Sequence, residues 1–355
     1  MAGETESVIK TMLAMQRHPW EQGVCAQALY EAGREDLWIP MAHDAIMRQS
    51  RDGRLGMVGG EAAVSDPAAN GEVCLRAFEK TGDPFYRMGA ERMLQYLKHD
   101  APRTADGIIC HNNVSFEEGF SPCQLWIDGL YMVPPFLAVM GETDEAETQI
   151  RGYIRHLFDD DAGLFFHIID TESGRFVRRK HWATGNGWAL LGLGRVTEAL
   201  AEQGHGTAAE EIACFQRRLL DAMLRYQLAD GRFHDILDAP ETFVDGTSAM
   251  MMAAAVYRGI YHGYIDSSRR IAAETAYRTV SERIDAYGLI HEVCGCPDFT
   301  SEGTSAEAQA AFVMAHNWRE RLIALSGHEP AGRRRTGHGG GAGGQRSKLA
   351  LQPEC

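Results

Sequence analysis

The chain has 355 residues, of which 45% are hydrophobic, and a formal net charge of −14. The apolar content is sufficient for one large core, and the negative charge argues against nucleic acid and anionic membrane surfaces as partners. No apolar run approaches the roughly 20 residues of a membrane-spanning helix. The start, MAGETESVIKTMLAMQRH, lacks the basic region and cleavage site of a secretory signal, so we expect an intracellular, cytoplasmic protein.

Helical periodicity dominates the chain, and strand-like alternation is scarce. The predicted helices cover residues 7–32 (interrupted at His18-Pro19), 36–48, 71–81, 84–98, 128–140, 143–157, 187–203, 208–227, 246–262, 267–284 and 305–325. Turns in which an acid precedes a glycine recur between them, at Asp52-Gly53, Asp106-Gly107, Asp161-Ala162-Gly163 and Asp230-Gly231. A helical hairpin with a recurring loop every ~50–60 residues is typical of a repeat architecture. We therefore predict an all-α fold, an (α/α)6 toroid of two helix rings with these loops beside a cleft.

The end of the chain differs in composition from the rest. Residues 1–327 are predicted to form the barrel, whereas residues 328–355 are rich in glycine and arginine without apolar periodicity. Such a composition favours a disordered extension over a nucleic-acid or localisation patch.

The eight cysteines do not indicate a metal site. Six stand singly in apolar surroundings, which indicates buried, reduced thiols. Cys294-Gly295-Cys296 is too tight for a usual zinc knuckle and has no second pair. We predict neither a metal nor a cofactor.

One stretch, FEEGFSPCQLWIDGLYMVPPF (residues 116–136), surrounds Asp128 with apolar and aromatic side chains. Burial disfavours the charged form of a carboxyl group, so the pKa of Asp128 is expected to be raised. A raised pKa suits a general acid that works near neutral pH. In the alternative interpretation, Asp128-Gly129 is a simple turn and Pro134-Pro135 begins the next helix.

Nine motifs resemble, in order and spacing, the unsaturated uronyl hydrolases, specifically the rhamnogalacturonyl hydrolase type of glycoside hydrolase families 105 and 88. They are HPWEQGV (18–24), SDPAANGEVCLRAFEKTGDPFYRMGAERMLQYL (65–97), APRTADG (101–107), QLWIDGLYMVPPFLA (124–138), GLFFHIID (163–170), HWATGNGWALLGLG (181–194), GRFHDILD (231–238), DGTSAMM (245–251) and GTSAEAQAAFVMA (303–315). The resemblance implies the same (α/α)6 barrel. It also implies hydrolysis of small oligosaccharides that carry a 4,5-unsaturated uronic acid at the non-reducing end, above all the unsaturated rhamnogalacturonan disaccharide. No cofactor is implied, and the protein is expected to be a monomer or homodimer.

Carried over to this sequence, the resemblance makes Asp128 the general acid and base, Asp66 a second carboxylate and His167 an active-site histidine. It makes Trp182 and Trp188 aromatic walls of the sugar pocket, and we expect Trp126, close to Asp128, to bind the substrate with them. From the residues alone, Asp66 before Pro67 is equally an N-cap. His167 after two phenylalanines is, from the residues alone, more typical of a core histidine, and Trp182 and Trp188 stay open to interpretation as core side chains.

One position departs from the family pattern. Its Trp-x-Arg-x-x-Gly-Trp motif reads Trp182-Ala183-Thr184-Gly185-Asn186-Gly187-Trp188 here, and a hydroxyl group does not replace a guanidinium. The substrate carboxylate is then bound either by a cation from Arg178, Arg179 or Lys180 or by neutral hydrogen bonds from Thr184 and Asn186. We favour the neutral pair, because residues 184–187 read as a polar turn and residues 178–180 as a solvated charge run.

Two other functions stay open. A conventional glycosidase needs two carboxylates about 5–9.5 Å apart, which Asp66 and Asp128 could supply. An inactive sugar-binding relative would keep the toroid as a scaffold, although such a scaffold would not need Asp66, Asp128 and His167 together.

Overall fold

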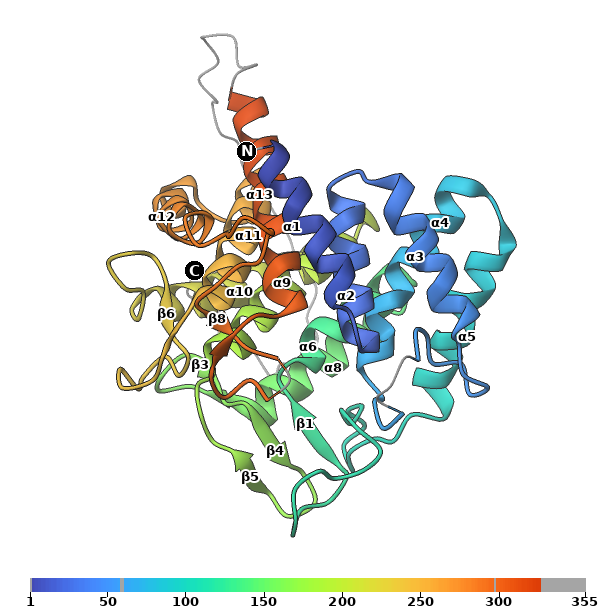
Figure 1. The fold of residues 1–355 in the computed structure, drawn as a ribbon. Coiled ribbons are helices and arrows are strands. Elements are labelled where there is room, and N and C mark those ends of the chain that lie inside the picture. Colours follow the sequence, from blue (N-terminus) through green and yellow to red (C-terminus); the bar gives the residue numbers. More distant parts are fainter. Residues whose placement is uncertain (1, 58–60, 297, 327–355) are drawn as a thin grey trace, which may run out of the picture.

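Helices make up most of the fold, and the computed structural model describes residues 2–57, 61–296 and 298–326 (Figure 1). The helices are α1 (Ala2–Met15), α2 (Pro19–Glu31), α3 (Glu35–Met47), α4 (Ala69–Thr81), α5 (Pro84–His99), α6 (Gly129–Met132), α7 (Pro134–Val139), α8 (Thr143–Leu157), α9 (Ala183–Glu202), α10 (Gly206–Leu224), α11 (Gly246–His262), α12 (Arg270–Ser281) and α13 (Ala306–Ser326), with short 3₁₀ helices η1 (Asp66–Ala68) and η2 (Ser267–Arg269). The extension predicted for residues 328–355 lies outside the described residues.

Alternate helices form a closed inner ring. Helix α2 contacts α4, α4 contacts α7, and the contacts continue through α9, α11 and α13 back to α2. The intervening helices α3, α5, α8, α10 and α12 pack against ring members next to them in the chain, and α1 packs against α13. Helices α6 and α7 share one inner position, since Pro134-Pro135 begins a new helix after Val133. The predicted (α/α)6 toroid is thereby confirmed.

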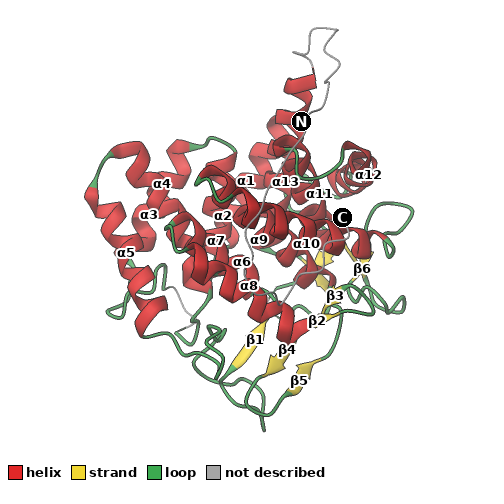
Figure 2. Ribbon diagram, turned by 180° about the vertical axis from the view of Figure 1, so that it is seen from behind, coloured by secondary structure: helices red, strands yellow, loops and turns green. Residues whose placement is uncertain are grey.

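The described strands are short and gather at one end of the helices (Figure 2). One antiparallel sheet has the order β1 (Gln124–Trp126), β4 (Ile168–Asp170), β5 (Arg175–Arg178). The two-stranded pairs are β2 (Phe158–Asp159) with β3 (Leu164–Phe165), β6 (Phe233–His234) with β7 (Val244–Asp245), and β8 (Val293–Cys294) with β9 (Glu302–Gly303). Strands of two to four residues are too short to show an alternating pattern, which explains why the sequence did not predict them.

These strands belong to the loops that lead from an outer helix to the N-terminus of the next inner helix. The four predicted Asp-Gly turns also lie in loops from an outer to an inner helix, after α3, α5, α8 and α10. One end of the toroid therefore combines the inner-helix N-termini, the sheet β1-β4-β5 and the long loops.

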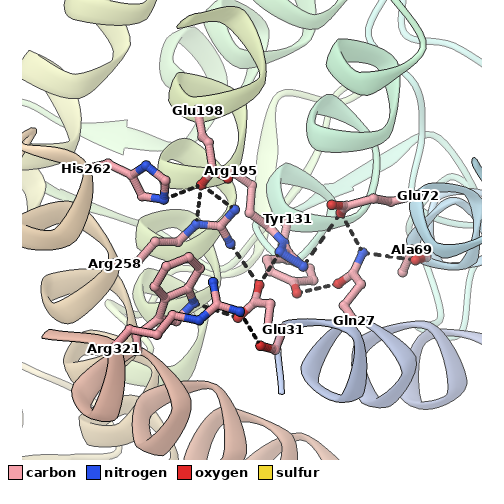
Figure 3. Close-up of polar contacts among 11 residues, drawn as sticks. Gln27, Glu31, Ala69, Glu72, Tyr131, Arg195, Glu198, Arg258, His262 and Arg321 are labelled. Carbon is pink, nitrogen blue, oxygen red and sulfur yellow. Dashed lines mark hydrogen bonds and ion pairs between the residues drawn. The ribbon is translucent and has the colours of Figure 1, made fainter. Parts of the chain in front are cut away.

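Farther along the inner helices lies a cluster of buried charges (Figure 3). Glu31, at the end of α2, is 4% exposed, and its Oε1 lies 2.6 Å from Arg195 Nη1 and 2.8 Å from Arg258 Nη1. Trp318 Nε1 donates to the other carboxylate oxygen at 2.7 Å. Arg195 also lies 3.6 Å from Glu72. One carboxylate thus links α2, α9, α11 and α13 through partners that satisfy its buried charge.

Glu31→Gln is expected to destabilise the protein strongly, by about 3–5 kcal/mol, because two buried guanidinium groups lose their shared counter-charge. Chemical denaturation followed by circular dichroism measures the loss. Glu91→Gln is the matched control, since it breaks the exposed pair with Arg87 on α5 and should cost less than about 1 kcal/mol. Equal losses in the two variants would contradict a structural role of the cluster.

Candidate active site

A cavity of about 550 Å³ lies at the end of the toroid where the inner helices begin. Side chains from the N-terminal ends of α2, η1, α6, α9 and α13 line it, together with β1, β5 and loop residues 111–120 and 298–300. Helix N-termini carry partial positive charge and favour an anionic ligand. The cavity therefore combines a field that attracts an anion with several side-chain carboxylates.

Asp128 stands at the N-cap of α6, directly after β1. The backbone N–H of Ile127 donates to the carbonyl of His167 at 3.0 Å, which brings the two loops together. Asp128 Oδ2 then lies 3.6 Å from His167 Nε2. This oxygen and both ring nitrogens of His167 are buried without a hydrogen-bond partner among the described residues. Unsatisfied buried polar atoms that line a cavity are available to a ligand.

Asp66 is the first residue of η1, whose N-cap residue is Ser65, and it lines the same cavity. Beside it stands His111, whose Nε2 lies 3.8 Å from Asp66 Oδ1. Ser65 Oγ contacts His111 Nδ1 at 2.7 Å and orients the ring. Asp66 is thus a residue of the cavity wall, which agrees with its interpretation as a second carboxylate of the site.

The two aspartates differ in their electrostatics. Burial holds the pKa of Asp66 above its ordinary value, with the charge of Asp128 adding to the effect against attraction from His111. Burial also acts upward on the pKa of Asp128, but interaction with His167, reinforced by His111, leaves that pKa below its ordinary value. Burial lowers the pKa of His167. The expectation of a raised pKa at Asp128 is therefore wrong, because two imidazoles outweigh its desolvation.

Aromatic rings form the walls around these carboxylates. Trp126, Trp182 and Trp188 all line the cavity, as their predicted role requires. His111 stacks on Trp126 with ring centroids 4.6 Å apart, and His167 stacks on Trp182 at 4.4 Å. Indole faces of this kind suit the C–H faces of a sugar ring, and the same stacking holds both imidazoles in place.

Thr184 and Asn186 do not reach the cavity, and neither side chain has exposed surface. Thr184 Oγ1 donates to Asp245 Oδ2 at 2.9 Å. Asn186 accepts from the backbone N–H of Phe165 at 2.8 Å and donates to the carbonyls of Phe165 and Trp182. Their predicted role in substrate binding is therefore contradicted, because all of these groups already have partners inside the protein.

The segment between Trp182 and Trp188 is also helical, not the predicted turn. Helix α9 begins at Ala183, four residues before the predicted start at Gly187. A Cβ at Gly185 would lie 2.6 Å from Ile127 Cγ2, and one at Gly187 would lie 2.9 Å from Met251. These glycines permit close packing of inner elements and do not mark a turn.

Thr184→Val is expected to lower stability by about 1.5–3 kcal/mol, since it removes a hydrogen bond to a buried carboxylate, and to leave KM unchanged. Thermal unfolding and steady-state kinetics measure the two effects. Thr148→Val, at an exposed position of α8, is the control and should shift stability by less than about 0.5 kcal/mol. A raised KM with unchanged stability would restore Thr184 to the substrate site.

Arg178, at the end of β5, supplies a guanidinium to the cavity. In the antiparallel sheet, Arg178 of β5 pairs with Ile168 of β4, and Ile168 pairs with Trp126 of β1. Its Cζ lies 5.9 Å from the ring centre of Trp182, and its Nη2 lies 3.9 Å from Asp235. The guanidinium of Arg179 lies instead over Phe166 and Phe176. Arg178 is thus the member of the predicted charge run that faces the site.

Sequence reasoning missed His111 and Glu307. His111 follows the short apolar run GIIC after the Asp106-Gly107 turn, and that position at the end of a cleft-side loop was the available signal. Glu307 lies on the first turn of α13 within GTSAEAQ, where an acid reads as a favourable helix start.

Across residues 2–57, 61–296 and 298–326, no group of three or more His, Cys, Asp or Glu side chains is arranged to hold a metal ion. Within the same residues no helix is long and apolar enough to cross a membrane.

The family model described as Glycosyl Hydrolase Family 88 matches residues 1–310. The chain belongs to this family. It is 27% identical over 261 residues to the unsaturated rhamnogalacturonyl hydrolase YesR of Bacillus subtilis (strain 168), covering 70% of this chain and 73% of the relative.

Two solved structures share the fold. A Salmonella enterica (subsp. enterica serovar Paratyphi A) protein described as a possible member of family 105 superposes with a TM-score of 0.77 at 18% identity, covering 91% of this chain and 94% of that one. The family 105 glycoside hydrolase of C. acetobutylicum ATCC 824 has a TM-score of 0.74 at 20% identity, covering 90% of this chain and 99% of that one. The protein is a glycoside hydrolase of the unsaturated uronyl hydrolase type.

Proposed function

We propose that the protein removes a 4,5-unsaturated uronic acid from the non-reducing end of oligosaccharides left by polysaccharide lyases, with the unsaturated rhamnogalacturonan disaccharide as the preferred substrate. The observation that carries the proposal is the pair of carboxylates, Asp66 and Asp128, in one cavity with the guanidinium of Arg178. The activity named for the Bacillus subtilis relative supports the choice of rhamnogalacturonan.

The reaction is a hydration that ends in bond cleavage. Asp128 donates a proton to C4, and the electron pair of the C4=C5 double bond forms the new C–H bond. Water adds to C5 and loses a proton to the Asp128 carboxylate. The resulting hemiketal opens by breaking the bond from C5 to the ring oxygen, and the hemiacetal left at C1 releases the second sugar.

The opposite pKa shifts of Asp66 and Asp128 suit different roles for the two carboxyl groups. Asp66, whose pKa is raised, holds a proton near neutral pH more readily than Asp128 does. When the substrate carboxylate enters, it adds a negative charge and displaces water, and both changes raise the pKa of Asp128. Protonation of Asp128 is thereby coupled to binding of an anionic sugar.

The direct test is incubation with unsaturated disaccharides produced by pectin, hyaluronan, chondroitin and ulvan lyases. Loss of the ultraviolet absorbance of the conjugated ene-carboxylate reports turnover, and the rhamnogalacturonan disaccharide should react fastest. Saturated uronides should not be cleaved. Cleavage of a saturated uronide at a similar rate would instead support a conventional two-carboxylate glycosidase.

A further inference from the structure

Glu307 is a cavity carboxyl group to which the proposed reaction assigns no role. It is the second residue of α13, is 1% exposed and contributes to the cavity wall. Its Oε2 is buried without a hydrogen-bond partner among the described residues. Leaving a buried oxygen unsatisfied is costly, so an unpartnered oxygen in a residue of the cavity wall points to a ligand contact.

The titratable groups around Glu307 are the thiols of Cys25, Cys294 and Cys296 and two further acids. From α2 comes Glu21, 2% exposed, whose carboxylate accepts hydrogen bonds from the backbone N–H groups of Arg17 and His18. From the start of α11 comes Asp245, which is fully buried and accepts from backbone N–H groups, including that of Cys294 at 2.8 Å. Both neighbours already have their own donors.

A third buried negative charge beside these two acids would be unfavourable. Burial, with the charges of Glu21 and Asp245, raises the pKa of Glu307 well above its ordinary value, although its own backbone N–H and Ser305 act in the opposite direction. These surroundings favour the neutral form of Glu307, and a neutral carboxylic acid has one O–H to donate.

We propose that Glu307 is a substrate-binding residue that donates its carboxyl O–H to an uncharged hydroxyl group of the sugar. The contact rests on the proposed function, because it requires a sugar in this cavity. Arg178 and Glu307 would then divide recognition between them: the guanidinium binds the anionic group, and the acid binds a neutral position.

Kinetics of Glu307→Gln and Glu307→Ala on the disaccharide that is turned over test the contact. Glutamine has nearly the shape of a neutral acid and keeps a donor, so its KM should stay close to that of the wild type. Alanine loses one neutral hydrogen bond and should raise KM about three- to tenfold, with a smaller change in kcat. Glu302→Gln, at an exposed position of β9 outside the cavity wall, is the control and should be silent.

The pH dependence separates a donor from an acceptor. The wild-type KM should rise on the alkaline side, where Glu307 ionises and can no longer donate, and Glu307→Gln should lack that rise. Equal increases of KM in the glutamine and alanine variants would mean that an ionised Glu307 accepts hydrogen bonds, which overturns the proposal. A loss of melting temperature in Glu307→Ala without a change in KM would also overturn it, since the role would then be structural.

Infrared difference spectroscopy tests the acid without relying on turnover. The wild type at neutral pH should show the carbonyl band of a protonated carboxylic acid, and Glu307→Gln should lack it. Absence of that band overturns the inference even where turnover is normal. Absence of turnover on every unsaturated disaccharide, with the band present, overturns the proposed function and the sugar contact that depends on it.

Discussion

Asp128→Asn is expected to fold normally and to lose about 10²–10⁴-fold in kcat, because general acid–base groups contribute rate factors of that size. The amide is nearly isosteric with the carboxyl group and can still hydrogen-bond. It cannot deliver a proton to C4 or accept one from water. The loss should therefore appear in kcat, while the melting temperature stays near that of the wild type.

Turnover is measured by the decrease in ultraviolet absorbance of the unsaturated disaccharide, and folding by circular dichroism. Asp161→Asn is the matched control, since this carboxylate is exposed in another Asp-Gly turn and does not line the cavity. It should retain full activity. An Asp128→Asn variant within tenfold of the wild type would remove Asp128 from the mechanism and would leave Asp66 as the principal acid.

Arg178→Ala is expected to raise KM strongly. Removing a charged partner from a buried anion typically costs about 2–5 kcal/mol, and each 1.4 kcal/mol corresponds to about tenfold in affinity. The side chain of Arg178 is 26% exposed, so solvent partly screens its charge. We therefore expect an effect near the lower end of this energy range, an increase in KM of about 30-fold. Steady-state kinetics should show this change in KM with a smaller change in kcat.

Arg179→Ala is the control for Arg178→Ala, because it removes an equal charge from the next residue, whose guanidinium lies over Phe166 and Phe176. It should leave KM nearly unchanged. Arg178→Lys should recover only part of the affinity, since an ammonium cannot form the two parallel hydrogen bonds of a guanidinium. A silent Arg178→Ala variant would show that the substrate carboxylate is bound elsewhere in the cavity.

The position of Arg178 offers a substitute for the family arginine that Thr184 replaces in this chain. With Thr184 in the arginine position, the sequence left a neutral pair and a neighbouring cation as alternatives. Thr184 bonds to buried Asp245, and Arg178 lines the cavity from β5. We infer that the cation has been supplied from an adjacent strand, and the two arginine variants test this directly.

The sequence alone determined two features of this protein, its toroidal fold and the main residues of its candidate site. The helical periodicity and the recurring Asp-Gly turns predicted the toroid, because both depend on local spacing that each segment carries by itself. The apolar shell around Asp128, together with the ordered motifs, placed Asp66, Asp128, His167 and the three tryptophans at the site, and all of them line the cavity.

The tertiary structure alone decided which polar groups reach the cavity and how they titrate. Thr184 and Asn186 stand between two cavity tryptophans in the chain, yet helix α9 turns their side chains toward buried partners. His111 comes from a loop and Glu307 from the last described helix, and only the tertiary structure brings them into one cavity with Asp66 and Asp128. The lowered pKa of Asp128 has the same origin, since neighbours remote in the chain outweigh the desolvation that its own segment imposes.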